Sequence, residues 1–191
     1  QIIRFDTALT GMELDEDQIK TALLRRLEWS CNRLSLDVIS DFIPAVGANI
    51  AACPHNAEDI DDVCAFPGRL SVAMGTIRPV EPAAYGVSTH LASILLQTRK
   101  VDSDKGAILN LRPPMKRASK TEVDMKSIKK VCSELGWEIT TAKRGDVSLD
   151  TEFIDLIVDI GDFGWEPSLY ILANNPLEIV EKTHTFVSTL R

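Results

Sequence analysis

The amino-acid sequence predicts an α/β fold, and three observations support this prediction. Segments with helical periodicity alternate with short apolar segments along most of the chain, an order typical of a sheet covered by helices. Glycine and proline residues separate these segments, and Gly136 follows a helical pattern where a C-terminal cap is expected. The chain has 191 residues, of which 45% are hydrophobic and 26% charged, so it can bury one good core.

The first third of the chain predicts one long helix followed by short elements. Asp15–Leu36 has apolar residues at nearly helical spacing and an acidic start that suits the positive end of the helix dipole. Ala45–Ala52 is a run of small apolar residues that predicts a strand. Asn56–Val63 is expected to form a short acidic helix or turn with Asn56 as its N-cap.

The rest of the chain continues the alternation of strands and helices. Two strands that form a hairpin, four further strands and three helices are predicted. The hairpin strands are Leu70–Met74 and Ile77–Val80; the other strands are Ala107–Leu111, Trp137–Thr141, Phe153–Ile160 and Ser168–Ala173; the helices are Ser88–Lys100, Glu122–Leu135 and Pro176–Leu190.

Charge and composition exclude several classes of function. A formal net charge of −7 argues against direct binding of nucleic acid, which needs a basic face. No apolar run is long enough to span a bilayer, and the first residues lack the pattern of a signal peptide. We therefore expect a cytoplasmic protein with no membrane partner. Because the chain begins at Gln1, we also expect an upstream domain, with residues 1–42 as a helical connector and residues 43–191 as the ligand-binding domain.

The four cysteines do not form a metal-binding or redox motif. None of them is paired in CxxC spacing, so we expect buried thiols of a cytosolic protein. His55 lies two residues after Cys53, but no second pair completes a metal site. No metal ligand is therefore predicted.

Two glycine-containing turns carry the side chains most suited to chemistry. Phe66–Arg69 ends in Arg69, and Tyr85–His90 ends in His90 at the start of a predicted helix. The free N–H groups of a helix N-terminus attract anions, a guanidinium matches phosphate oxygens, and a histidine titrates near neutral pH. Together these features predict a pocket for a phosphorylated small molecule.

The order and spacing of six segments resemble those of the ThiN-type thiamine-phosphate synthase domain of archaea and some bacteria. The similarity runs from about Ile43 to the C-terminus. The segments are Ile43–Ile50, Pro54–Ala57, Val63–Arg69, Gly86–His90, Leu109–Arg112 and Gly161–Pro167.

This resemblance implies a fold, a reaction and two functional residues. The fold is a three-layer α/β/α sandwich with a mixed sheet, similar to class II aldolases but without their zinc. The reaction joins a pyrimidine diphosphate to a thiazole phosphate and gives thiamine monophosphate. Arg69 and His90 match the functional arginine and histidine of the family, and magnesium is the expected cofactor if the chain is an enzyme.

Two departures from the family pattern favour a sensor over an enzyme. Ile160 stands where the family usually has arginine, and the connection Thr140–Thr151 is too short for the family's additional helix. We therefore expect the ligand-binding domain of a transcription regulator that binds thiamine monophosphate or diphosphate, without a cofactor. Such a regulator would contact DNA only through the upstream domain and would form a homodimer. The alternative is an active thiamine-phosphate synthase.

Several residues are candidate ligand contacts, each with a simpler structural alternative. His90 could instead bond to a nearby carbonyl, Ser88 could be only an N-cap, Asp162 could be only a turn residue, and Met74 could be a core residue. Asn49 and Asn110 could either support the fold or read the pyrimidine edge. The predicted ligand contacts are Asn49, Arg69, Met74, Gly86, Val87, Ser88, Thr89, His90, Asn110 and Asp162, with Arg69 and His90 catalytic in the enzyme alternative.

Overall fold

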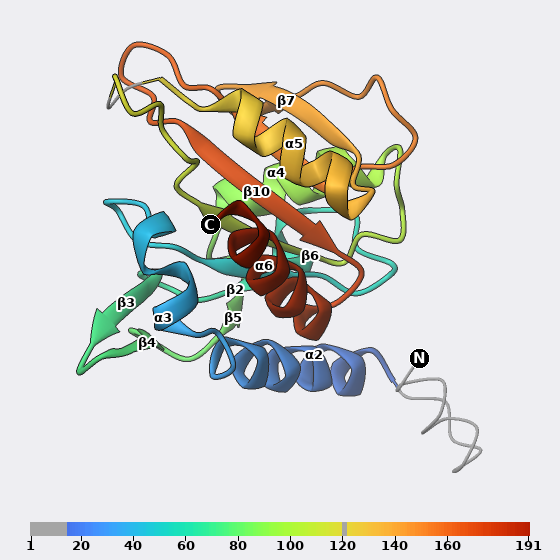
Figure 1. The fold of residues 1–191 in the computed structure, drawn as a ribbon. Helices are drawn as coiled ribbons and strands as arrows, with labels where there is room; N and C mark the ends of the chain where they lie inside the picture. The colour runs from blue at the N-terminus through green and yellow to red at the C-terminus, as the bar shows by residue number, and fades with distance from the viewer. Residues whose placement is uncertain (1–14, 120–121) are drawn as a thin grey trace.

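A computed structural model describes residues 15–119 and 122–191, and a mixed sheet lies at its centre (Figure 1). Among these residues the sheet has eight strands in the order β5-β2-β1-β6-β10-β9-β7-β8. The β7–β9 pair is parallel, and the other neighbouring pairs are antiparallel. The strands are β1 (Ile50–Ala52), β2 (Cys64–Ala65), β5 (Ala84–Tyr85), β6 (Ala107–Leu111), β7 (Ile139–Lys143), β8 (Asp146–Val147), β9 (Leu156–Asp159) and β10 (Ser168–Ala173).

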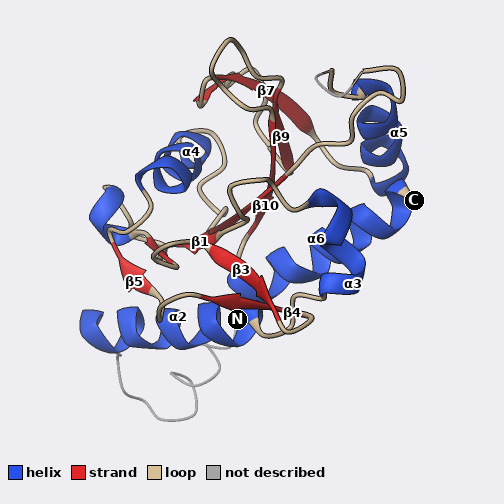
Figure 2. Ribbon diagram, turned by 90° about the vertical axis from the view of Figure 1, so that its left-hand side faces the viewer, coloured by secondary structure: helices blue, strands red, loops and turns tan. Residues whose placement is uncertain are grey.

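Helices cover both faces of the sheet, which confirms the predicted α/β class and its three layers. Figure 2 shows α4 (Thr89–Arg99) on one side of the strands and α5 (Met125–Leu135) and α6 (Pro176–Leu190) on the other. The long helix α2 (Glu16–Cys31) packs along α6 and β1, and the short helix α3 (Leu36–Ile39) also contacts α6. Two 3₁₀ turns, Ser40–Phe42 and Ile60–Asp62, complete the helical elements described.

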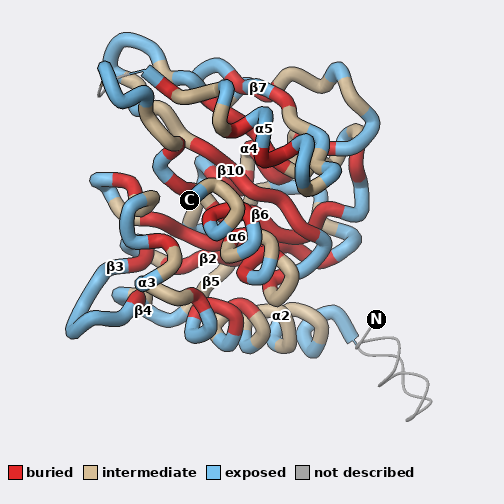
Figure 3. Tube along the Cα trace, in the orientation of Figure 1, coloured by how far each residue is buried: buried red, intermediate tan, exposed pale blue. Residues whose placement is uncertain are grey.

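Alternation along the central strands creates two separate cores. In β6, Leu109 and Leu111 belong to the core beneath α2, α5 and α6, whereas Ile108 belongs to the core beneath α4. This two-residue period is a general property of strands. Figure 3 shows that the central strands are buried along most of their length. In the β6–β10 register, Asn110 is paired with Tyr170, so both side chains lie on the α4 face of the sheet.

Local sequence signals fix several helix ends, among them the predicted C-terminal cap at Gly136. Asp15 caps α2 through a reciprocal capping box with Gln18, Gly136 ends α5 with a left-handed φ of 67°, and Asn175 caps α6. Helix α2 ends at Cys31, earlier than the predicted Leu36.

Other elements differ from the predictions for physical reasons. Strand β1 begins only at Ile50, because residues 44–47 form a turn in which the Gly47 N–H donates to the Pro44 carbonyl at 2.9 Å. Asp59, not Asn56, caps the 3₁₀ turn at Ile60–Asp62. The connection after residue 140, for which no strand beyond Thr141 was predicted, forms a hairpin of β7 and β8. The predicted hairpin is present as β3 (Leu70–Ala73) and β4 (Thr76–Pro79), a separate two-stranded ribbon.

Candidate active site

One pocket of about 360 Å³ brings together most of the predicted ligand contacts. It lies where the start of α4, the turn at residues 66–69 and the middle of the sheet meet. Glu166 and Ser168, which the sequence analysis did not select, also line this pocket. The predicted residues that line it are Asn49, Arg69, Val87, Ser88, Thr89, His90 and Asn110.

The start of α4 presents backbone donors to this pocket. Ser88 occupies the N-cap position, as predicted, but its side chain makes no capping hydrogen bond. The first-turn N–H groups of a helix have no partner within the helix. The uncapped first turn of α4 therefore forms a favourable anion site at the pocket wall.

Arg69 reaches the pocket from a backbone conformation that arginine rarely adopts. Its φ is 69°, directly after Gly68 with a φ of 67°. The Arg69 N–H donates to the Phe66 carbonyl at 3.2 Å, and its Nη1 donates to the Val46 carbonyl at 3.2 Å. Left-handed non-glycine residues are strained and often occur at functional sites. The turn therefore places an exposed guanidinium at the pocket at a cost in backbone energy.

His90 is held by an aromatic partner instead of a backbone carbonyl. Its Nε2 lies 2.7 Å from the Tyr170 hydroxyl, and its ring packs against Trp165 with centroids 5.6 Å apart. Although His90 is exposed overall, these neighbours enclose one edge of its ring. Burial of that edge, followed by the positive charge of Arg69, lowers the pKa of His90 below its usual value, while Asp159 opposes this shift. Burial raises the pKa of Tyr170 to about 12, so both groups are neutral at pH 7.

Asp159 connects three segments that surround His90. Its side chain is fully buried and accepts hydrogen bonds from the Gly145 N–H at 2.9 Å, Trp165 Nε1 at 3.0 Å and the Gly161 N–H at 3.0 Å. The tip of the β7–β8 hairpin thus lies beside His90, where a Cβ on Gly145 would be 3.5 Å from the His90 ring. Sequence reasoning missed Asp159, although an aspartate at the end of an apolar strand is a detectable signal.

Both predicted asparagines have structural roles, and one also retains a free donor. Asn49 Nδ2 donates to the Phe66 carbonyl at 2.9 Å, and its Oδ1 accepts from the Ile50 N–H at 2.9 Å. Asn110 Oδ1 accepts from the Asn49 N–H at 2.7 Å. Asn110 Nδ2 has no acceptor within residues 15–119 and 122–191, so it is available to a ligand in the pocket.

Three predicted residues do not line this pocket. Gly86 forms the turn before α4, where a Cβ would lie 2.9 Å from Asp61 Oδ1. Met74 is 94% exposed at the tip of the β3–β4 ribbon, so the core alternative for it is wrong. Asp162 forms a tight turn with Trp165 through two backbone hydrogen bonds of 3.0 and 2.8 Å and lines neighbouring hollows.

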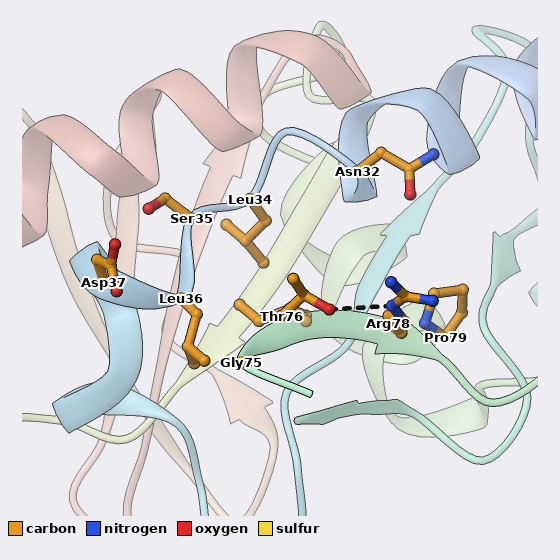
Figure 4. Close-up of a pocket in the computed structure, with 10 residues that line it drawn as sticks. Asn32, Leu34, Ser35, Leu36, Asp37, Gly75, Thr76, Arg78 and Pro79 are labelled. Atoms are coloured by element: carbon orange, nitrogen blue, oxygen red, sulfur yellow. Dashed lines mark hydrogen bonds between the residues drawn. The ribbon is translucent and has the colours of Figure 1, made fainter. Parts of the chain in front are cut away.

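A second hollow of about 660 Å³, between the α2–α3 link and the β3–β4 ribbon, contains none of the predicted site residues (Figure 4). Thr76 and Arg78 lie side by side along β4 in Figure 4, and the Nε of Arg78 donates to the Thr76 hydroxyl at 2.9 Å. This hollow therefore lacks the convergent donors of the Arg69–His90 pocket.

The comparison with protein families agrees with this geometry. The profile described as "ThiN: Thiamine-phosphate synthase ThiN" matches residues 26–185. The chain belongs to this family. In this ThiN chain the match begins within α2 and includes every residue of the Arg69–His90 pocket.

Curated relatives and a solved structure agree with the family. Over 150 residues the chain is 29% identical to the bifunctional thiamine biosynthesis protein ThiDN of Methanocaldococcus jannaschii, covering 73% of this chain and 34% of that protein. It is 26% identical over 175 residues to the thiamine-phosphate synthase ThiN of Methanothermobacter thermautotrophicus, covering 78% of this chain and 86% of that protein. The crystal structure of a phosphomethylpyrimidine kinase C-terminal domain superposes with a TM-score of 0.72 at 21% identity, over 87% of this chain and 99% of that domain. The chain thus spans about a third of the bifunctional relative, and the solved structure supports the fold.

These comparisons correct the expected function. The prediction of a sensor domain in a transcription regulator is wrong, because the family and both curated relatives are named for thiamine biosynthesis. The two departures at Ile160 and Thr140–Thr151 therefore do not distinguish a sensor from an enzyme. The second of these segments contains the β7–β8 hairpin, which packs beside His90.

The described residues form neither a metal-binding cluster nor a membrane-spanning helix. Residues 15–119 and 122–191 contain no group of three or more His, Cys, Asp or Glu side chains placed to hold a metal ion. In the same ranges, the helices lack the length and apolar character needed to cross a bilayer. The four cysteines are buried free thiols, as predicted.

Proposed function

We propose that this chain is a thiamine-phosphate synthase that joins hydroxymethylpyrimidine diphosphate to thiazole phosphate. The observation that supports this proposal most strongly is the convergence of Arg69, His90 and the uncapped start of α4 on one pocket. These three features supply a guanidinium, an imidazole and backbone N–H groups, which together match a diphosphate.

The proposed reaction is a displacement at the methylene carbon of the pyrimidine. The thiazole nitrogen gives its lone pair to that carbon, and the carbon–oxygen bond to the diphosphate breaks, with its electron pair leaving on the diphosphate. No oxidation and no net proton transfer are needed. The chief demand on the protein is therefore to stabilise the negative charge that develops on the leaving oxygen.

Arg69 and His90 meet this demand in different ways. Arg69 supplies permanent positive charge at the pocket wall. His90 is neutral at pH 7 because its pKa is lowered, and it is oriented by Tyr170 and Trp165. A neutral imidazole held in this way can donate one N–H hydrogen bond to the leaving group and does not itself take up a proton.

Magnesium fits this pocket as a companion of the diphosphate. Mg²⁺ usually retains several waters and binds through substrate phosphates and one or two carboxylates. Glu166 supplies a carboxylate in the pocket lining. When bound, the ion would neutralise part of the charge on the diphosphate.

A turnover assay tests the proposal. The protein would be given the two substrates with magnesium, and thiamine monophosphate would be measured for the wild type, Arg69→Ala and Arg25→Ala. Arg25 is an exposed arginine of α2 outside the pocket, so it is a matched control. We expect multiple turnovers for the wild type and the control, and a loss of about 100-fold or more for Arg69→Ala. Absence of turnover in folded wild-type protein would contradict the proposal.

A further inference from the structure

A larger hollow adjoins the Arg69–His90 pocket, and the reaction needs a place for a second substrate. This second-substrate hollow has a volume of about 850 Å³, against about 360 Å³ for the first pocket. Glu166 lines both spaces, so the two spaces are neighbours at this residue. Two substrates that must react with each other would need this kind of adjoining arrangement.

The walls of the second-substrate hollow suit an aromatic ring. Ile43, Met115, Ile160 and Pro167 supply apolar surface, and Trp165 supplies an aromatic one. Ile160 is 57% exposed, so it offers apolar surface to a ligand without being part of a core. Binding sites for small molecules are commonly apolar with a few polar groups that fix orientation.

One cation in this hollow is available to bind an anion. Arg112 follows β6 directly, is exposed and lines the hollow. Its backbone N–H donates to the Phe42 carbonyl at 2.6 Å, which anchors the residue. Its guanidinium has no hydrogen-bond or ion-pair partner in the described part of the chain. A free guanidinium beside an apolar wall matches a phosphorylated heterocycle.

We propose that this hollow binds thiazole phosphate, with its phosphate on Arg112 and its ring against Ile160 and Trp165. This inference rests on the proposed synthase function. The pyrimidine diphosphate, which carries more charge, then occupies the pocket that has Arg69 and the start of α4. Glu166 lines both spaces, so the two substrates would lie on either side of this residue.

Steady-state kinetics with each substrate varied separately tests the assignment. The variants are Arg112→Ala, Arg112→Lys and the control Arg25→Ala. We expect Arg112→Ala to raise KM for thiazole phosphate about tenfold or more, with less than about a twofold change in KM for the pyrimidine diphosphate. With the unphosphorylated thiazole alcohol as substrate, the wild type and Arg112→Ala should have similar KM values.

Calorimetric titration of thiazole phosphate into the proteins gives a readout that does not need turnover. Weaker binding by Arg112→Ala than by Arg25→Ala supports the inference, even if the wild type proves inactive and the proposed function fails. If the wild type is active and Arg112→Ala leaves KM and binding for thiazole phosphate unchanged, the inference is wrong and the proposed function stands. An equal rise in KM for both substrates would also overturn it, because Arg112 would then serve the whole site.

Discussion

The Tyr170 hydroxyl in the middle of the sheet lies 2.7 Å from Nε2 of His90 in the first turn of α4. The two residues are 80 positions apart in the sequence. This contact fixes the ring of His90 relative to β10, and β10 is one of the most deeply buried strands. The orientation of the imidazole is therefore determined by the core of the protein, not by a mobile loop.

Replacing Tyr170 by phenylalanine removes this contact while keeping most of the buried volume. We expect kcat for thiamine monophosphate formation to fall about tenfold or more, since a positioning partner of a functional histidine is lost. The acid limb of the pH–rate profile should move as well. A variant with unchanged kcat and an unchanged pH profile would show that the hydroxyl does not position His90.

Removing the charge of Arg69 should change the titration of His90. Because this charge lowers the pKa of His90, we expect the pKa to rise in Arg69→Met, measured by NMR titration of the histidine ring protons. Arg25→Met, which alters a distant arginine, should leave it unchanged. A fall in the pKa of His90 would contradict the structure.

The left-handed backbone at Arg69 should affect the free energy of unfolding of variants at this position. Alanine at this position retains the strained φ of 69°, whereas glycine adopts it freely. We expect Arg69→Gly to be more stable than Arg69→Ala by about 1 kcal/mol, measured by urea unfolding. The reverse order would mean that the turn relaxes when the arginine side chain is lost.

Asp159 should be important for the stability of the segments around His90. In Asp159→Asn, an amide nitrogen would replace one of the oxygens that accept from Gly145, Trp165 and Gly161. We expect a loss of about 2 kcal/mol in the free energy of unfolding. Relative to the wild type, hydrogen exchange in Asp159→Asn should speed up more at the β7–β8 hairpin than at β6. An equal increase in exchange rate in both regions would argue against Asp159 as a local anchor.

The lowered pKa of His184 should make the free energy of unfolding depend on pH. Its Nε2 accepts from the Ser35 N–H at 3.0 Å, and burial followed by the charge of Arg33 lowers its pKa below the usual value. The unfolded chain then binds a proton more readily than the folded one, so the stabilisation is present above about pH 6.5 and is lost as the pH falls through the folded pKa. We expect His184→Gln to show a smaller loss of stability between pH 7.5 and pH 5 than His55→Gln, in urea unfolding. Equal losses in the two variants would contradict this.

The sequence predicted local features well where they depend on nearby residues. Ala107–Leu111, Ser168–Ala173 and Pro176–Leu190 agree with β6, β10 and α6, because their periodicity and caps are local. The two-residue strands β2 and β5 have no detectable pattern, since their pairing depends on neighbours far along the chain.

In the candidate site too, features set by nearby residues could be predicted and features set by distant residues could not. Turn chemistry and the family resemblance selected Arg69 and His90, and the structure places both in one pocket. Tyr170 and Glu166 could not be selected, because their place beside these residues depends on the register of the sheet and the path of a loop. Sequence reasoning treated Ile160 as the loss of a cation and did not consider that Arg112 lines the same hollow.

The missing side-chain cap at Ser88 has a thermodynamic consequence. A bound diphosphate would complete the first turn of α4, so ligand and helix would form one cooperative unit. Ligand binding stabilises the folded state in proportion to the logarithm of its concentration. With the proposed function, the melting temperature of this protein would then report the supply of its own substrate.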